Sequence, residues 1–344
     1  MKIEKKNEGE ITLFTITNSK GAKVVLSTLG AGIVSVEVPD RNGNMADVCL
    51  GYANPADYLA DGPCAGKIPG RFANRIAKGH FNLDGKNYSL SINNGPNALH
   101  GGPTGFMNRI WQAEETADGV RFTYTAADGE EGYPGNLTAT ATYSWNDECR
   151  LRLHLEAQTD APTVVNLTNH AYWNLEGHNS GSVLDHTLYL ACSKFLPTDE
   201  TLIPTGKIAA VDGTPMDFTE PKKIGRDIKA SFPSLKYGKG YDSCWVIDGY
   251  KKNCEMRLAA VLTAPESGRV LEVATTQPAA QVYTGNWLAG CPANKAGRSY
   301  NDYDGVAIEC QNMPDAPNHA NFPSAVLRPG EKYDETIDFT FKVK

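Results

Sequence analysis

The sequence predicts an all-β protein, and three observations lead to that prediction. Apolar and polar residues alternate wherever a regular pattern can be found, which is the period of a half-buried strand. Turn-forming residues are abundant, with 33 glycines and 20 prolines among 344 residues. A sustained period of 3.6 residues, typical of amphipathic helices, is absent. Because the strands are too numerous for a small barrel, we expect large antiparallel sheets packed face to face.

The first strands are expected near the N-terminus. Residues 24–28 and 33–38 are rich in β-branched side chains, and each run is soon followed by glycine or proline. Such side chains pack well on a pleated surface. Residues 54–59 favour a short helix, with Asn54 as its cap and Pro55 at its first position.

Alternation is clearest in the later strands. In residues 151–157 (LRLHLEA) the apolar side chains fall at every second position, and residues 336–343 repeat this pattern. The apolar residues of the last segment are expected on one face of a strand, namely Ile337, Phe339, Phe341 and Val343. Turn dipeptides recur between the strands; they are Asn42-Gly43, Asp84-Gly85, Asp212-Gly213 and Asp248-Gly249.

The chain carries no linker, composition shift or clear repeat that would divide it, so we expect a single domain over residues 1–344. A chain of this length buries about three quarters of its unfolded surface, so it needs neither disulfides nor a structural metal for stability. Its eight cysteines form no Cys-x-x-Cys pair and do not cluster with histidine. We expect reduced thiols and no metal site.

Charge and hydropathy exclude two classes of partner. With 40 acidic and 33 basic residues the net charge is -7, and no Lys/Arg block could displace counterions from nucleic acid. No stretch of about 18 apolar residues could cross a membrane as a helix. Dispersed thiols, and an N-terminus without a signal-like apolar run, predict a cytoplasmic protein. A processed periplasmic protein is the alternative.

Residues 166–175 (NLTNHAYWNL) combine three asparagines, one histidine and two aromatic rings. Amide and imidazole groups bond sugar hydroxyls, while aromatic rings cover the apolar C–H face of a pyranose. The segment therefore indicates a sugar site around His170. The alternative is a buried His170 that satisfies a backbone group at a strand end, which is the commoner role of an isolated histidine.

Two further loops carry candidate binding groups. In residues 70–76 (GRFANRI), Asn74 and Arg75 follow a glycine, and arginine offers a rigid fork of donors. A structural arginine bridging two loops is the alternative. In residues 97–102 (NALHGG), two glycines would let a ligand or another backbone approach His100. Taken alone, that segment favours a tight turn with an incidental histidine.

Two later segments add weaker signals. Asp242 stands just before an apolar run in residues 240–246 (GYDSCWV), where a carboxylate is usually a turn or capping residue. In residues 277–287 (QPAAQVYTGNW), Gln281 and Tyr283 share one face if the segment is extended. For the rings of Tyr283 and Trp287, core packing is the favoured role.

Glu309 lies in residues 305–311 (GVAIECQ), at the end of an apolar β-type run. Partial burial would raise the pKa of its carboxyl group toward a value that suits a general base near neutral pH. The alternative is a structural glutamate that is ion-paired with an arginine, for which Arg75 is the candidate.

Together these segments resemble the aldose 1-epimerase, or galactose mutarotase, family. GRFANRI, LHGG, NLTNHAYWNL, GYDSCW, QVYTGNW and AIECQ stand in the family's order and at similar spacing. The similarity extends through LSTLGAGIVSVEVPDRNG, DVCLGY, GTPMDF and LRPGEKYDETIDFTF, from about residue 26 to the C-terminus. Six concordant motifs are far more specific than one. The resemblance implies a large antiparallel β-sandwich of the galactose mutarotase-like supersandwich type, with few short helices.

The resemblance also implies an isomerase that interconverts the α and β anomers of free aldohexoses such as galactose and glucose, without a cofactor. Glu309 would be the base and His170 the acid. Other matching positions would hold the sugar, namely Asn74, Arg75, His100, Asp242 and Gln281. Further residues would line the site, namely Tyr283, Trp173, Asn169 and Tyr172. The expected partner is a monosaccharide, and the chain would be a monomer or homodimer.

Three other functions remain open from the sequence. A hexose-6-phosphate 1-epimerase on the same fold would need extra cations for the phosphate, and Arg71 is the only obvious spare. A non-catalytic carbohydrate-binding protein could keep the pocket without the chemistry. A glycosidase normally needs two carboxylates about 5 to 9.5 Å apart, and a Glu–His pair fits that less well.

Overall fold

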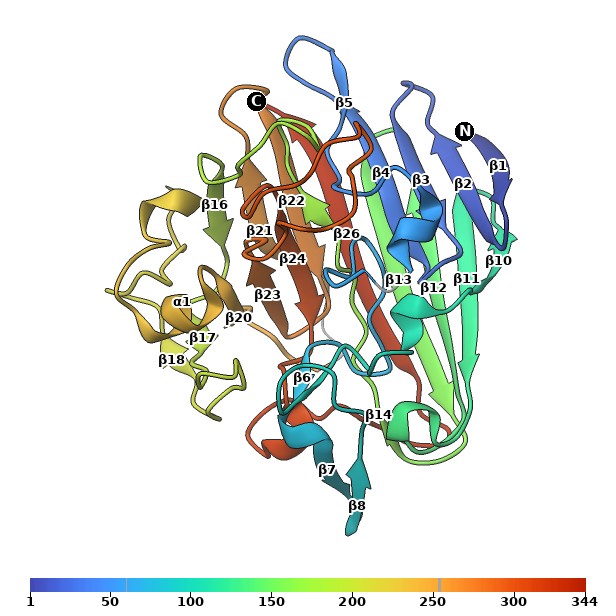
Figure 1. Ribbon diagram of the computed structural model, residues 1–344, viewed down its shortest axis with the longest axis vertical. Helices are drawn as coiled ribbons and strands as arrows, with labels where there is room; N and C mark the ends of the chain where they lie inside the picture. The colour runs from blue at the N-terminus through green and yellow to red at the C-terminus, as the bar shows by residue number, and fades with distance from the viewer. Residues whose placement is uncertain (60, 253–254) are drawn as a thin grey trace.

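The computed structural model describes residues 1–59, 61–252 and 255–344 and consists mainly of antiparallel strands (Figure 1). This confirms the predicted all-β class and the sandwich that the family resemblance implies. The described residues hold a single short α-helix, α1 (Pro233–Gly238), and no helix among them is long and apolar enough to cross a membrane.

A nine-stranded sheet forms one layer of the sandwich. Its last strand in sequence, β26, lies between β13 and β22 and therefore joins two halves made from distant parts of the chain. In sheet order the strands are β10 (Gln112–Glu115), β11 (Gly119–Ala126), β12 (Leu137–Trp145), β13 (Arg150–Thr159), β26 (Tyr333–Val343), β22 (Arg269–Thr275), β21 (Arg257–Thr263), β16 (Thr187–Leu190) and β19 (Lys222–Lys223).

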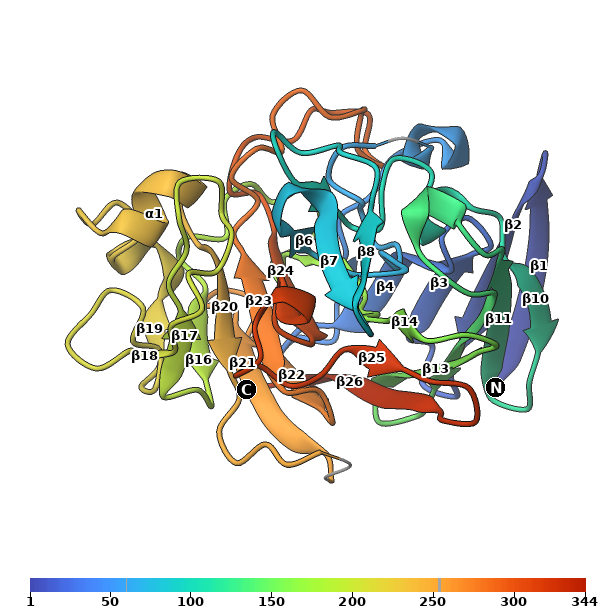
Figure 2. The same ribbon diagram turned by 90° about the horizontal axis from the view of Figure 1, so that it is seen from below.

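Two smaller sheets face this layer. The first consists of β1 (Lys2–Glu8), β2 (Ile11–Thr17), β3 (Lys23–Ser27), β4 (Gly32–Pro39) and β5 (Met45–Asp47). The second runs in the order β15 (Tyr172–Trp173), β24 (Val306–Gln311), β23 (Ala279–Tyr283), β20 (Asp242–Val246), β17 (Lys194–Leu196) and β18 (Ala209–Ala210). Figure 2 shows the layers edge on.

The core lies between these layers. Phe14 of β2 packs edge-on against Phe122 of β11, which joins the five-stranded sheet to one half of the large sheet. Trp173 of β15 contacts Phe339 and Phe341 of β26, which joins the six-stranded sheet to the other half. Apolar alternation along each strand supplies these inward-facing side chains.

Three short strand pairs and six 3-10 helices of the described residues lie outside these three sheets, and β6 lies near the ends of β23 and β24 (Figure 1, Figure 2). The pairs are β6 (Arg75–Ile76) with β9 (Ala98–Leu99), β7 (His80–Leu83) with β8 (Lys86–Ser89), and β14 (Thr163–Val164) with β25 (Val326–Leu327). The 3-10 helices are η1 (Pro55–Tyr58), η2 (Ala77–Gly79), η3 (Phe106–Asn108), η4 (Glu130–Gly132), η5 (Ile224–Arg226) and η6 (Ala316–Asn318).

The predicted local elements are confirmed with small differences. Strands β3, β4, β13 and β26 coincide with the four segments that show β patterns, and η1 forms where a short helix was expected. Asn54 occupies the cap position, but its amide bonds the carboxylate of Asp57 rather than a backbone N–H. Ile337, Phe339, Phe341 and Val343 occupy alternate positions of β26, as expected, but Val343 is 42% exposed where the first three are buried.

Candidate active site

A cavity of about 870 Å³ opens over the six-stranded sheet. Loops from the short strand pairs and from the segments around residues 57–63, 200–202 and 287–292 form its rim. The lining includes eight of the eleven residues that the sequence suggested for the site, namely Asn74, Arg75, His100, His170, Tyr172, Asp242, Tyr283 and Glu309.

Strand register brings four polar side chains to one face. Glu309 of β24 pairs with Gln281 of β23, and Tyr283 of β23 pairs with Asp242 of β20. Because alternate residues of a strand point to the same side, all four side chains share a face. Residues between them, such as Ile308, belong to the apolar core. The apolar runs thus act as rigid supports for the polar groups.

His170 and Glu309 form a close pair on the wall of this cavity. His170 Nε2 lies 3.5 Å from Glu309 Oε1, and Glu309 is only 2% exposed. Within the described part of the chain, Glu309 Oε2 and His170 Nδ1 have no hydrogen-bond partner. A buried carboxylate and imidazole in contact are the groups that proton transfer requires.

Burial shifts both groups of the pair toward their neutral forms. Burial raises the pKa of Glu309 well above its ordinary value; Asp242 adds to that rise and Arg75 opposes it. Burial also lowers the pKa of His170 to about 4, and the charge of Lys67 lowers it further against an opposing backbone hydrogen bond. Between these two pKa values the pair holds a single proton.

The position of His170 is fixed from several sides. Its N–H donates to the carbonyl of Lys67, and its own carbonyl accepts from the N–H of Gly66, both at 2.9 Å. The imidazole packs against Tyr172, with ring centres 5.0 Å apart, and meets His100 edge-on at 5.3 Å. The ring is therefore held opposite Glu309 before any ligand binds.

Two loops are locked together at Asn74 and His100, and both residues have left-handed backbones, with φ of 64° and 54°. Asn74 N–H donates to His100 Nδ1 at 3.1 Å, and His100 N–H donates to the carbonyl of Asn74 at 3.0 Å. Burial keeps the pKa of His100 well below its ordinary value, and His170 and Arg75 add to this. Since Nδ1 accepts a bond, the neutral ring carries its proton on Nε2, where it can donate to a hydroxyl.

The glycines after His100 allow a backbone contact, as the sequence suggested. A Cβ atom at Gly101 would lie 1.9 Å from the carbonyl oxygen of Gly70, so only glycine fits there. The chain segment that approaches Gly101 is therefore the backbone at Gly70, at the start of the loop that carries Asn74 and Arg75, and not a ligand.

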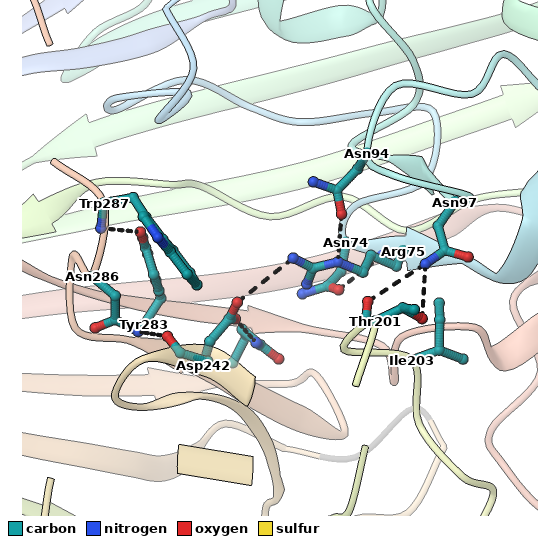
Figure 3. A network of polar contacts seen from close by, with 12 residues as sticks. Asn74, Arg75, Asn94, Asn97, Thr201, Ile203, Asp242, Tyr283, Asn286 and Trp287 are labelled. Carbon is teal, nitrogen blue, oxygen red and sulfur yellow. Dashed lines mark hydrogen bonds and ion pairs between the residues drawn. The ribbon is translucent and has the colours of Figure 1, made fainter. Parts of the chain in front are cut away.

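Arg75 is held in a chain of polar contacts (Figure 3). Its Nε donates to Asn94 Oδ1 at 3.0 Å, and its Nη2 lies 3.6 Å from Asp242 Oδ2. Gln281 Nε2 donates to Asp242 Oδ1 at 2.6 Å. Arg75 is thus the partner of Asp242, and the alternative in which it pairs with Glu309 does not occur. Gln281 is buried behind Asp242 and does not line the cavity.

The expected contact between Trp173 and the sugar is not supported by its position. Tyr172 and Trp173 are consecutive in β15, so their side chains point to opposite faces. Tyr172 lines the cavity, whereas Trp173 is 0% exposed and packs on the aromatic rings of β26. Asn169 also lies outside the cavity and donates to the carbonyl of Gly66 at 2.6 Å.

Trp287 and Asn94 are two of the lining residues that the sequence analysis did not assign to the site. Trp287, for which core packing was the simpler expectation, is 49% exposed and stacks on Tyr283 with ring centres 6.4 Å apart. Asn94 lines the cavity and bonds Arg75. The turn signal NNGPN around it marked a loop, but no local pattern indicates where that loop points.

Arg71, the spare cation that a sugar phosphate would need, is buried away from the cavity. Its Nη1 donates to the carbonyls of Pro134 and Gly135 and to Thr163 Oγ1, at 2.6, 2.9 and 3.1 Å. Among the described residues that line the cavity, Arg75 is the only lysine or arginine.

An antiparallel sandwich with a buried acid–base pair, convergent amide and imidazole groups and a stacked aromatic wall defines a sugar-binding enzyme that moves protons. The profile of the aldose 1-epimerase family matches residues 12–340. The chain belongs to this family, and it is an isomerase that interconverts the anomers of aldoses.

Several characterised relatives cover almost the whole chain. The galactose mutarotases of Sus scrofa and Homo sapiens are each 44% identical to it over 321 residues, which span 93% of this chain and 91% of theirs. The aldose 1-epimerase of Escherichia coli (strain K12) is 37% identical over 332 residues, 96% of this chain and 94% of its own. The crystal structure of a GalM/aldose epimerase homologue from C. elegans superposes with a TM-score of 0.88 at 33% identity, covering 96% of this chain and 98% of the other.

Proposed function

We propose that this enzyme interconverts the α and β anomers of free aldohexoses such as galactose and glucose, with Glu309 as general base and His170 as general acid. The observation that carries the proposal is the buried pair in which His170 Nε2 lies 3.5 Å from Glu309 Oε1. The names of the relatives, galactose mutarotase and aldose 1-epimerase, support this choice of substrate.

The reaction needs two proton transfers at a single carbon. Opening a pyranose requires removal of the proton on the C1 hydroxyl and delivery of a proton to the ring oxygen, and both oxygens are bonded to C1. Glu309 takes the first proton while His170 gives the second, and the C1–O5 bond breaks. The aldehyde end then rotates about C1–C2 and the ring closes on the other face. In this closing step Glu309 returns its proton and His170 receives one.

The proton content of the pair suits this cycle. With the proton on His170 the pair is ready to open a ring, and with the proton on Glu309 it is ready to close one. Burial raises the pKa of Glu309 and lowers that of His170, so the pair keeps one proton over a wide pH range. Each positioned group typically contributes about 10²- to 10⁴-fold in rate.

The remaining polar groups of the cavity are proposed to hold the sugar. Asn74, Arg75, His100 and Asp242 offer donors and acceptors to hydroxyl groups, and Gln281 holds Asp242 in place through its 2.6 Å hydrogen bond. The stacked rings of Tyr283 and Trp287 offer a flat surface for a pyranose C–H face.

The charge of the cavity supports a free sugar rather than a sugar phosphate. Five carboxylates line it, those of Asp57, Asp61, Glu200, Asp242 and Glu309, and of these Asp61 is ion-paired with Lys67 behind the wall. The guanidinium of Arg75 is the one Lys/Arg charge among the described lining residues, and it is already paired with Asp242. A phosphate would meet net repulsion there. We expect the rate with free galactose or glucose to exceed the rate with the 6-phosphate by at least ~100-fold.

Polarimetry tests the proposal directly. Freshly dissolved α-galactose, α-glucose, arabinose and xylose are followed with wild type, Glu309→Gln and His170→Asn. Each variant should lose at least ~100-fold in rate while keeping its fold and weak sugar binding in calorimetry. A wild-type rate in either variant would remove that residue from its role. Sugar binding without any change in the decay of optical rotation by the wild type would indicate a non-catalytic binding protein.

The cellular setting is a separate proposal. We propose a cytoplasmic, single-domain enzyme that is a monomer or homodimer. The cysteines in the described part of the chain are all unpaired, as a reducing compartment would leave them. One hydrophobic cluster includes residues from Phe14 to Phe341, which supports one domain. Cell fractionation and sedimentation analysis test the location and the oligomeric state.

A further inference from the structure

A buried ion pair lies at the cavity wall: Asp61 lines the cavity, and its partner Lys67 does not. The ammonium group of Lys67 contacts Asp61 Oδ1, and Lys67 is only 1% exposed. The ammonium also donates to the carbonyl of Tyr58 and, at 3.2 Å, to Asn108 Oδ1. Buried ion pairs contribute little net stability, because both charges lose their hydration. A charged pair at this position therefore calls for a role other than holding the fold together.

Asp61 anchors the other end of the pair. Its Oδ2 accepts hydrogen bonds from Tyr52 Oη at 3.1 Å and from the N–H of Ala65 at 2.8 Å. The N–H of Cys64 donates to the carbonyl of Asp61, and the N–H of Lys67 donates to the carbonyl of Cys64. Main-chain hydrogen bonds within residues 61–67 therefore stabilise this segment in addition to the ion pair at its two ends.

This segment is the one that holds His170. The carbonyl of Lys67 accepts from the N–H of His170, and the N–H of Gly66 donates to the carbonyl of His170. Gly66 admits no side chain, since a Cβ there would lie 1.9 Å from the carbonyl oxygen of Ile33. A displacement of Lys67 would therefore move the main chain of His170 with it.

Few ionisable groups face the imidazole of His170. Glu309 of β24 lies at 3.5 Å, Tyr172 of β15 and Tyr283 of β23 pack on the ring, and His100 meets it from the loop after β9. Burial is the main cause of the lowered pKa of His170, and Lys67 is the one permanent charge that adds to it.

We propose that Lys67, fixed by Asp61, is a positioning residue for His170: it holds the main chain of the histidine opposite Glu309 and keeps a buried positive charge near the imidazole. The proposal rests on the role of His170 as general acid. A nearby ammonium group disfavours the imidazolium, so it makes His170 a stronger proton donor toward the ring oxygen. Lys67 does not line the cavity and touches no substrate.

NMR titration of His170 without sugar tests the electrostatic part, and the signal is assigned by its loss in His170→Asn. In Lys67→Gln the pKa of His170 should rise by about half a unit or more, the size expected for one partly screened charge. In Asp61→Asn the ammonium loses its counter-ion, so the pKa of His170 should fall or stay. Lys222→Gln is the matched control, because Lys222 is also buried and paired, with Asp227 at 2.8 Å, but lies outside the cavity.

The outcomes separate this role from a purely structural one. Loosening of the site would admit water and raise the pKa of His170 in both variants, and that result would overturn the proposal. No rise in Lys67→Gln would overturn it as well. If either single variant fails to fold, the double variant Lys67→Gln/Asp61→Asn replaces the ions by hydrogen-bonding amides. The pKa of His170 should then rise, and an unchanged value would count against the proposal.

Kinetics supply a second readout. Lys67→Gln should lower kcat several-fold with KM unchanged, and the low-pH limb of kcat/KM should move to higher pH together with the titration of His170. A change in KM alone would contradict the positioning role. Full activity of His170→Asn would refute the general acid itself while leaving the sugar-free titration intact, so the two failures are distinguishable.

Discussion

Replacing Glu309 by glutamine should make the protein more stable as it becomes inactive. Glu309 is buried, and its pKa is raised well above its ordinary value, 4.5, chiefly by burial. A raised pKa means that the folded state keeps a proton that the unfolded chain has already released. This contribution to stability is fully present below pH 4.5 and is lost as the pH rises toward the pKa of the folded state.

The size of the effect follows from this difference. Each pH unit between the two pKa values costs the folded state about 1.4 kcal/mol, so the loss grows as the pH rises from 4.5 toward the pKa of the folded state. Glutamine keeps the shape of the side chain and does not titrate, so Glu309→Gln avoids that loss. The variant should gain little at pH 5 and most at pH 7 and above.

Urea unfolding at pH 5, 6, 7 and 8 measures this comparison. The free energy of unfolding of the variant, minus that of wild type, should increase with pH, while the slope against urea concentration stays the same. If the difference in unfolding free energy does not depend on pH, burial does not raise the pKa of Glu309 and the argument is refuted. A variant less stable than wild type at pH 8 would refute it as well.

Three further predictions follow from the site and its surroundings. Because the pKa of His170 is lowered to about 4, kcat/KM should persist at pH 5.5, measured by polarimetry; a half-maximal drop near pH 6.5 would mean that an ordinary histidine controls the rate. Trp287→Ala should raise KM about fivefold with little change in kcat, since one stacking face is worth about 1 kcal/mol, whereas Trp173→Phe should lower stability and leave KM unchanged. Burial lowers the pKa of His186 to about 4, and its Nε2 accepts from the N–H of Leu175, so stability should fall as the pH drops from about 6.5 toward 4. His186→Gln should weaken that dependence by up to roughly 2 kcal/mol between pH 7 and pH 5 in thermal unfolding, and an unchanged dependence would contradict this.

Much of the strand content could be predicted from the sequence, because alternation is a local property. Residues 151–157 and 336–343 show it plainly and form parts of β13 and β26. The pairing of these two strands could not be predicted, because it joins segments that are far apart and no local pattern specifies a partner. The exposed end of β26 at Val343 has the same cause, since the extent of the core depends on the facing sheet.

Many residues of the candidate site could be predicted from the sequence, but not which of their side chains face the cavity. Glu309 and His170 stand out because polar groups in apolar or aromatic segments are unusual. Trp173 was expected at the sugar and Trp287 in the core, but the structure shows the reverse. The two-residue strand β15 directs Tyr172 to the cavity and Trp173 to the core, and a loop places Trp287 at the cavity. Lys67 gave no signal, since a lysine between glycine and isoleucine in a loop normally lies in solvent.

The central place of β26 in the large sheet has a consequence for biosynthesis. Strands β13 and β22 leave the ribosome before it, and each then carries an open edge that only β26 can fill. A nascent chain at that stage exposes unpaired strand edges, which favour association with other chains. We expect a chain cut off before residue 333 to aggregate, and the intact chain to become protease-resistant only after β26 has emerged.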